Sequence, residues 1–300
     1  MIKTQKLILT YHDVESAKYP KVVGSYPISM KRFKKQIQLL KSKGFIFDYI
    51  SNLTKKNNHE RICYITADDG LTDWTKNVLP WCEKEKIPTH NAIITGPLED
   101  KRVYPLAHII QVKLVQDTEK NLNNLCRFLK NDILSDAELS YINKIYFYEK
   151  IEYRRIIKGA FNLVLDTKKA YKILGDLSGT VLKHLQCRFE NLNYYKQFKY
   201  TECGVHGRTH CALEHDTSAY IKNEIISCQN FLKKNNIAPS KYYTLPMRPK
   251  YNSTVEDLIK PLTKLGFSGI FAEQGCWNQK DFIIRRIDAK NVENFVNENY

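Results

Sequence analysis

Two neighbouring carboxylates stand where a predicted strand ends, and such a pair can carry out chemistry. The stretch Thr66-Ala67-Asp68-Asp69-Gly70 follows a short apolar run, and its glycine allows the chain to turn. Neighbouring carboxylates repel each other, so their pKa values move apart unless a cation takes one of them. One of the two can then bind a metal while the other stays free as a base. The alternative is an Asx turn without chemistry, because Asp-Gly pairs are common in turns.

A histidine pair forms the second informative stretch, His206-Gly-Arg-Thr-His210. Two histidines four residues apart lie on one face of a helical turn and can bind one metal ion. The pair is weak evidence alone, but like the aspartate pair it follows a predicted strand. Two histidines and one carboxylate, with one position open to water, make the ligand set of a catalytic zinc. The same set can hold non-haem iron.

A third stretch, Leu245-Pro-Met-Arg248-Pro-Lys-Tyr251, also follows a predicted strand. An arginine at a strand end can pair with a carboxylate and hold it ionised and oriented. An ordinary exposed turn is the alternative for this loop.

The predicted elements place all three stretches at the ends of strands. Apolar, β-branched and aromatic runs typical of strands cover residues 6–11, 45–50, 61–65, 90–95, 203–206, 242–245, 268–272 and 282–287. Helical patterns cover residues 30–43, 73–86, 218–234 and 254–265. Strands that alternate with helices predict a parallel α/β sheet or barrel. Such folds place their chemistry at the carboxyl ends of the strands.

Between residues 104 and 200 the pattern changes to long helical runs, over residues 109–129 and 135–157, without strand-like alternation. We interpret this segment as a helical insertion or lid within a single domain that spans residues 1–300. A chain of 300 residues, 43% of them hydrophobic, is long enough for one barrel-sized core, although two smaller domains also fit.

Composition narrows the class of protein. Mean hydropathy is −0.46, and no apolar run reaches the roughly 18 residues of a membrane-spanning helix. The apolar run after Lys6 is too short for the core of a signal peptide, so we expect a cytoplasmic protein. The 8 cysteines include no CxxC pair, which excludes a zinc knuckle and a thioredoxin motif and predicts buried free thiols.

The chain carries a net charge of +15 and has a pI of about 9.3. Such a surface attracts anions: nucleic acid, the inner leaflet of a membrane, or phosphorylated substrates. The alternative is a lysine-rich composition that only solvates helix faces.

Taken together, the motifs resemble those of the polysaccharide deacetylases, the NodB-homology proteins of carbohydrate esterase family 4. The resemblance covers residues 6–98 and 200–290 and rests on the order and spacing of the three stretches above. Two further stretches look like members of that family: Leu9-Thr-Tyr-His12-Asp-Val14 near the start and Ile284-Arg-Arg-Ile287 near the end.

The resemblance implies a distorted, TIM-like (β/α) barrel of the NodB type with a helical insertion at residues 104–200. It implies that Asp69, His206 and His210 hold a divalent metal, with zinc as the expected ion. The metal would polarise the amide carbonyl and lower the pKa of its water.

The resemblance also implies roles for three further residues. Asp68 would be the general base that takes the proton of the water. Arg248 would orient Asp68, and the backbone N–H of Tyr251 would help to form the oxyanion hole.

Two departures from the family pattern matter. Gly207 stands where many members have Ser or Thr, and no histidine follows His215, so the late histidine that usually protonates the leaving amine is missing. Some members with an early Tyr-His-Asp-Val motif use that histidine instead, which makes His12 the candidate acid; a structural histidine at the barrel rim is the alternative. The remaining histidines, 59, 90, 108, 184 and 215, are interpreted as structural or surface residues.

The primary hypothesis is a metal-dependent N-deacetylase, a hydrolase acting on the acetamido group of a nucleotide-, lipid- or oligosaccharide-linked amino sugar in surface-glycan biosynthesis. The expected partners are that acetylated amino sugar and an anionic membrane surface, with no specific nucleic acid. The alternative is a catalytically impaired protein on the same barrel that binds a glycan or nucleic acid without turnover.

Overall fold

In the described part of the chain, parallel strands close into a seven-membered ring. The structure is a computed structural model, and it describes residues 5–14, 27–55, 60–175, 179–186, 188–189, 191–275 and 281–300. In spatial order the ring consists of β1 (Gln5–Tyr11), β3 (Arg61–Ala67), β4 (Thr89–Ile93), β5 (Thr201–Val205), β6 (Pro239–Thr244), β7 (Gly269–Gln274) and β8 (Ile283–Asp288). Strand β8 pairs back onto β1, and the short β2 (Ile46–Phe47) pairs additionally with β3. The predicted (β/α) barrel is confirmed.

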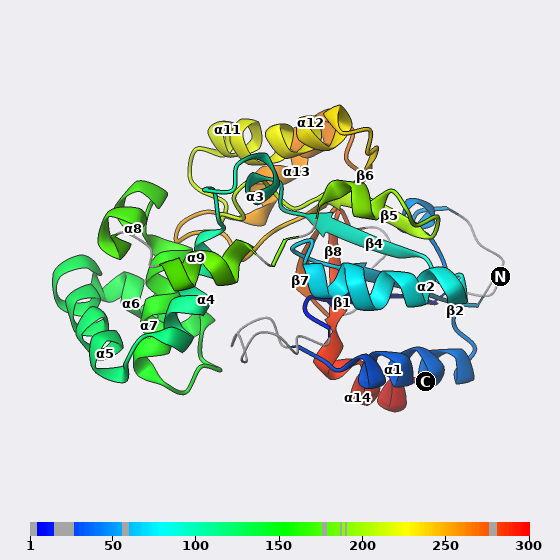
Figure 1. Cartoon of the computed structure of the whole chain (residues 1–300), viewed down its shortest axis with the longest axis horizontal. Helices are drawn as coiled ribbons and strands as arrows, with labels where there is room; N and C mark the ends of the chain where they lie inside the picture. The colour runs from blue at the N-terminus through cyan, green and yellow to red at the C-terminus, as the bar shows by residue number, and fades with distance from the viewer. Residues whose placement is uncertain are drawn as a thin grey trace.

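Helices flank the ring and form a separate block beside it. Those around the ring are α1 (Met30–Ser42), α2 (Leu79–Glu85), α3 (Gly96–Glu99), α10 (Leu192–Tyr195), α11 (Thr217–Tyr220), α12 (Ser227–Lys234), α13 (Ile259–Lys264) and α14 (Val292–Asn299). The block contains α4 (Leu106–Gln116), α5 (Glu119–Phe128), α6 (Asp136–Ile145), α7 (Glu152–Gly159), α8 (Thr167–Leu174) and α9 (Gly179–Gln186). Figure 1 shows these six helices, in green, to one side of the strands.

The first helix forms where the sequence pattern predicts it. The side chain of Ser29 accepts a hydrogen bond from the backbone N–H of Arg32, which satisfies one of the free donors at the helix start. The buried residues Phe33, Ile37 and Leu40 recur at helical spacing and face the barrel.

Two of the predicted helices differ in detail from the periodicity. The helix expected over residues 73–86 is confirmed as one continuous helical stretch, in which a π-helical segment, Trp74–Val78, runs directly into α2. Pro80 lacks the N–H that would bond to the preceding turn, which accounts for the irregular hydrogen bonding there. The helix expected over residues 109–129 ends at Gln116 because Thr118 caps a new helix by accepting from the backbone N–H of Asn121.

The helical block has a core of its own. Buried apolar side chains from α4, α5, α6, α7 and the π-helical turn Ala160–Val164 after α7 meet there, and Ile110, Leu122, Ile142, Ile157 and Phe161 are among them. A second cluster joins α4 to α9 through Ile109, Val112, Val181 and Leu185. The block is therefore held together by its own hydrophobic burial, independently of the contacts that attach it to the barrel.

Three of the residues interpreted from the sequence lie outside the described residues: His59, Cys187 and Cys276. The described cysteines, 63, 82, 126, 203, 211 and 228, are free thiols, and all but Cys211 are buried, as predicted. No helix of the described chain is both long and apolar enough to cross a bilayer.

An aromatic cluster attaches α1 to the carboxyl end of β1. The Phe33 ring is fully buried, with its centroid 5.1 Å from that of Tyr11 and 5.7 Å from that of Trp74. Tyr11 is the last residue of β1, and its hydroxyl donates to Gln36 on α1 at 2.9 Å. The cluster thereby positions the strand end from which His12 and Asp13 emerge.

We predict that Phe33→Ala lowers the free energy of unfolding by about 3–5 kcal/mol, because the substitution leaves a cavity that the rigid strand end cannot fill. The matched control is Phe147→Ala, since Phe147 is 72% exposed. This control is expected to change the free energy by no more than about 0.5 kcal/mol. Denaturant titration measures both, and a similar loss in the two variants would contradict the prediction.

Candidate active site

Strand register brings the acidic pair to the same end of the barrel as His12. Strands β1 and β3 pair from Gln5 opposite Arg61 to Tyr11 opposite Ala67. The residues that follow these paired ends, His12 on one strand and Asp68 on the other, therefore leave the sheet at the same level. His206 enters the same region because it follows β5, whose partner strand β4 continues the ring from β3.

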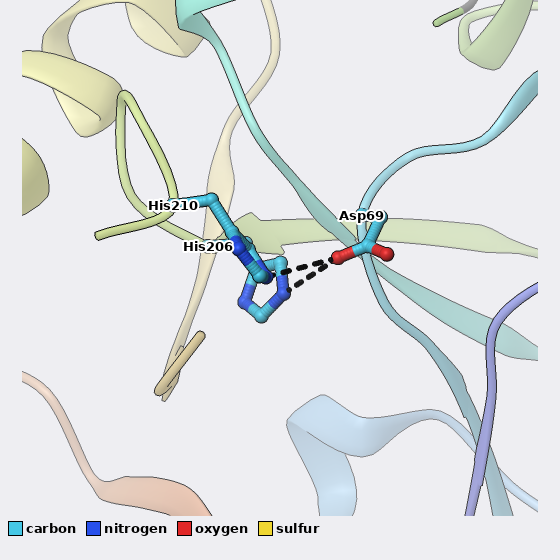
Figure 2. Close-up of side chains that lie close together, drawn as sticks. All are labelled: Asp69, His206 and His210. Atoms are coloured by element: carbon cyan, nitrogen blue, oxygen red, sulfur yellow. Dashed lines mark hydrogen bonds and ion pairs between the residues drawn. The ribbon is translucent and has the colours of Figure 1, made fainter. Parts of the chain in front are cut away.

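Asp69 is the centre of the candidate metal site. Its Oδ1 atom lies 3.1 Å from Nε2 of His206 and 3.2 Å from Nε2 of His210 (Figure 2). Asp69, His206 and His210 are all buried, and each offers a ligand atom within 4.8 Å of the others. Asp69 and His210 both have left-handed backbones, with φ of 73° and 60°. These turns reverse the chain locally and direct both side chains toward one point.

The donor chemistry of His206 fits a bound cation. Its Nδ1 lies 2.9 Å from the backbone carbonyl oxygen of Thr244, which only accepts, so Nδ1 carries the proton. Nε2 of a neutral ring then points a lone pair at the Asp69 carboxylate, and two such groups repel unless positive charge lies between them. Burial acts to lower the pKa of His206, but Asp69 and Asp68 outweigh it and raise that pKa. The geometry thus favours a cation, or a proton, between ring and carboxylate.

His108 also belongs to this centre, contrary to the interpretation of that residue as structural or surface. It lies on α4 in the helical block, is 2% exposed, and places Nε2 3.3 Å from the second carboxylate oxygen of Asp69. Nothing in its sequence context identifies it, because it is a single histidine within an apolar helix. Its role depends on how the block packs against the barrel.

Arg286, and not the expected Arg248, is the partner that keeps the Asp68 carboxylate ionised. Its Oδ1 lies 2.7 Å from Nη1 of Arg286, and its Oδ2 lies 2.7 Å from Nη2. Burial acts to raise the pKa of Asp68, but the Arg286 guanidinium outweighs it and holds that pKa well below its usual range. Thr10 also donates to Oδ2 at 3.3 Å, and Nε2 of His12 lies 3.8 Å from the same oxygen.

The expectation that Arg248 orients Asp68 is therefore corrected. Arg286 lies in β8, and β8 neighbours β1 in the closed ring, so its side chain reaches Asp68 and donates to Thr66 inside the barrel. Arg248 lies in the loop after β6, and its side chain is exposed.

The loop that contains Tyr251 is turned toward the helical block. The backbone N–H of Tyr251 donates to the carbonyl of Leu163 at 3.1 Å, and Nζ of Lys250 donates to the carbonyl of Leu165 at 2.8 Å. The hydroxyl of Tyr141 donates to the carbonyl of Pro249. Because its N–H is already bonded to the block, Tyr251 does not supply the expected oxyanion donor.

A pocket adjoins the site where the barrel loops meet the helical block. Its empty volume is about 720 Å³, and His210 forms part of its wall. Much of the wall is aromatic or aliphatic, including Tyr104, Phe161, Tyr171 and Met247.

We predict that Arg286→Met lowers the free energy of unfolding by about 3–5 kcal/mol at neutral pH, because it leaves Asp68 buried and charged without a partner. In the native chain the depressed pKa of Asp68 contributes stability above the unfolded pKa of about 3.9, and this stability is lost as pH falls. In the variant, burial still acts to raise that pKa and the strongest opposing group is gone, so protonation at lower pH restores stability.

The difference in unfolding free energy between the two proteins should therefore narrow as pH falls. Denaturant titrations over a pH series measure it, and adding Asp68→Asn to the variant is expected to recover much of the loss. A difference that does not change with pH would show that Asp68 is not the group affected.

Comparison with known proteins supports this architecture. No protein-family model and no curated protein matches the sequence. The deacetylase PplD of Streptococcus pyogenes, solved in complex with acetate, matches at a TM-score of 0.55 and 14% identity, over 97% of each chain. IcaB of Ammonifex degensii matches at 0.58 and 13%, over 98% of this chain and 97% of IcaB. A polysaccharide deacetylase of Bacillus cereus matches at 0.50 and 14%, over 98% of this chain and 68% of that one.

These matches agree with the family resemblance of the motifs, and they show a shared fold. The chain has the barrel fold of solved deacetylases. In this chain the candidate site described above lies at the carboxyl ends of the strands.

Proposed function

We propose that this protein is a metal-dependent N-deacetylase that hydrolyses the acetamido group of an amino sugar. The observation that carries the proposal is the separation of two adjacent carboxylates into two environments. Asp69 faces the histidines of a cation site, whereas Asp68 is held ionised by Arg286. The fold shared with solved deacetylases supports the same reaction class.

The residues that would hold the metal are Asp69, His206 and His210, with zinc as the proposed ion. Such an ion supplies Lewis acidity toward the amide carbonyl and the attacking water when it is bound. Three ligands leave room for substrate, which is the arrangement of catalytic rather than structural zinc.

Asp68 is the proposed general base. It is a neighbour of the metal ligand but bonds to a different set of groups, so it keeps its negative charge for proton transfer. Arg286 donates to both oxygens of the carboxylate, which fixes the orientation of the proposed base.

His12 is the proposed acid for the leaving amine. An amide nitrogen must be protonated as it departs, and an imidazolium can donate that proton near neutral pH. His12 lies next to Asp68, and its side chain is 31% exposed, so it has access to substrate as well as to the base. This position argues against the alternative of a binding protein without an acid.

The proposed substrate is an acetylated amino sugar linked to a nucleotide, a lipid or an oligosaccharide in surface-glycan biosynthesis. The aromatic walls of the pocket beside His210 offer faces on which a sugar ring can pack. The net charge of +15 supports a phosphate-bearing carrier or an anionic membrane surface as partner.

The first functional test distinguishes the proposed roles of the two aspartates, general base for Asp68 and metal ligand for Asp69. We expect Asp68→Asn to lower turnover by a factor of about 10²–10⁴, as for the loss of a general base, while metal content stays the same. His206→Ala should instead remove the metal. Acetate release from a panel of acetamido sugars and elemental analysis of the purified chains measure both. If Asp68→Asn empties the metal site, the two roles are assigned the wrong way round.

The second test concerns His12. The base must be ionised and the acid protonated, so the rate should follow a bell-shaped pH profile. We expect His12→Ala to lose activity by a factor of about 10² and to lose the alkaline limb of the bell, with metal retained. His215→Ala is the control, because His215 is exposed and outside the site. A normal rate with the alkaline limb intact in His12→Ala would place the acid elsewhere.

A further inference from the structure

A buried chain of polar side chains connects the helical block to the candidate metal centre. Nε of Arg188 donates to Nδ1 of His108 at 3.1 Å, and Nη2 of Arg188 donates to Oδ2 of Asp13 at 3.4 Å. Nε2 of His108 lies 3.3 Å from Oδ2 of Asp69. All four side chains are buried, so these contacts are shielded from water.

The contact with Arg188 determines which nitrogen of His108 carries the proton. A guanidinium in a protein stays protonated and only donates, so Nδ1 of His108 must accept. A neutral ring then carries its proton on Nε2, which donates to Asp69. This is the opposite tautomer from His206, whose Nδ1–H is engaged by the Thr244 carbonyl and whose Nε2 is left as an acceptor.

The two carboxylate oxygens of Asp69 consequently face groups of different kinds, potential metal ligands on one side and a hydrogen-bond donor on the other. Oδ1 faces the Nε2 atoms of His206 and His210, which can act as ligands. Oδ2 accepts from His108, whose Nε2 is a donor and not a ligand. A hydrogen bond to one oxygen of a ligating carboxylate fixes the direction in which the other oxygen points.

We infer that His108, held in its tautomer by Arg188, is a positioning residue that orients Asp69 for metal binding. The helical block then contributes side chains to the surroundings of the metal site. It supplies His108 from α4 and Arg188 from the turn after α9, and Asp13 from the end of β1 anchors Arg188 to the barrel. The metal site is complete only when the block is docked on the barrel.

Charge supports this arrangement. Asp13 and Asp69 are both buried carboxylates, and Arg188 lies between Asp13 and the neutral ring that contacts Asp69. Arg188 therefore balances the Asp13 charge, while the negative charge of Asp69 remains available for a cation on the side of His206 and His210.

The inference rests on the metal site of the proposed function but not on its substrate, so its test measures metal affinity. Zinc affinity of the purified full chain is determined by competition with a chromophoric chelator. We expect His108→Leu to weaken it by about 10–100-fold, the usual effect of losing a hydrogen bond to a ligand. His108→Gln should weaken it less, because a glutamine amide N–H can reach the place of Nε2 and donate.

Phe189→Leu is the matched control. The Phe189 ring packs against the His108 ring at a centroid distance of 5.3 Å, but it takes no part in the hydrogen-bond chain. If packing alone matters, Phe189→Leu will weaken zinc binding as His108→Leu does, and the inference fails. Unchanged affinity in Phe189→Leu with a loss in His108→Leu supports it.

Nitrogen-15 spectroscopy of the histidine rings gives a readout that a purely structural role would not move. In the zinc-loaded chain we expect His108 to carry its proton on Nε2, and Arg188→Met to abolish this preference. A His108 that loses the Nε2 proton when zinc binds would be a ligand itself and would overturn the inference. The measurement on the unaltered chain also decides the question if a variant does not fold.

The outcomes distinguish the two proposals. A wild-type chain without zinc affinity overturns both the metal site and the role of His108. Zinc affinity that is the same in wild type and in folded His108→Leu overturns only the role of His108.

Discussion

The site depends on the burial of two adjacent negative charges at the end of β3. Asp68 and Asp69 are 4% and 5% exposed, and burial by itself raises the pKa of each carboxyl. Both are nevertheless held ionised, each by its own neighbours, because positive and proton-donating groups surround them. The left-handed backbone at Asp69 turns it away from Asp68, so the two charges do not compete for one partner.

Closure of the barrel supplies the partners of Asp68. In an open sheet β1 and β8 would lie at opposite edges, whereas in the ring they pair, and Arg286 reaches across β1 to the carboxylate. Breaking this pair would leave an uncompensated charge in the interior, which is why closure of the barrel and ionisation of Asp68 are energetically linked. The stability of the fold and the role proposed for Asp68 therefore depend on the same contact.

The helical block supplies partners of a second kind. It contacts Asp69 through His108 and binds the loop that follows β6 through the backbone of Tyr251. Tyr251, which the family resemblance assigned to catalysis, thus helps here to attach the block. Two histidines of opposite tautomer, His108 and His206, then meet the same carboxylate from the block and from the barrel.

The sequence by itself determined the alternation of strands and helices, the strand ends and the residues that emerge there, Asp68, Asp69, His206 and His12, because hydrophobic periodicity and turn chemistry are local properties of the chain. Periodicity left a sheet and a barrel open, and only the resemblance to a family favoured the barrel. The sequence did not identify Arg286 as the partner of Asp68, or His108 as a partner of Asp69. Those contacts join residues more than 200 and nearly 40 positions apart, respectively. They follow from which strands become neighbours on closure and from how the block docks, and only tertiary packing decides either.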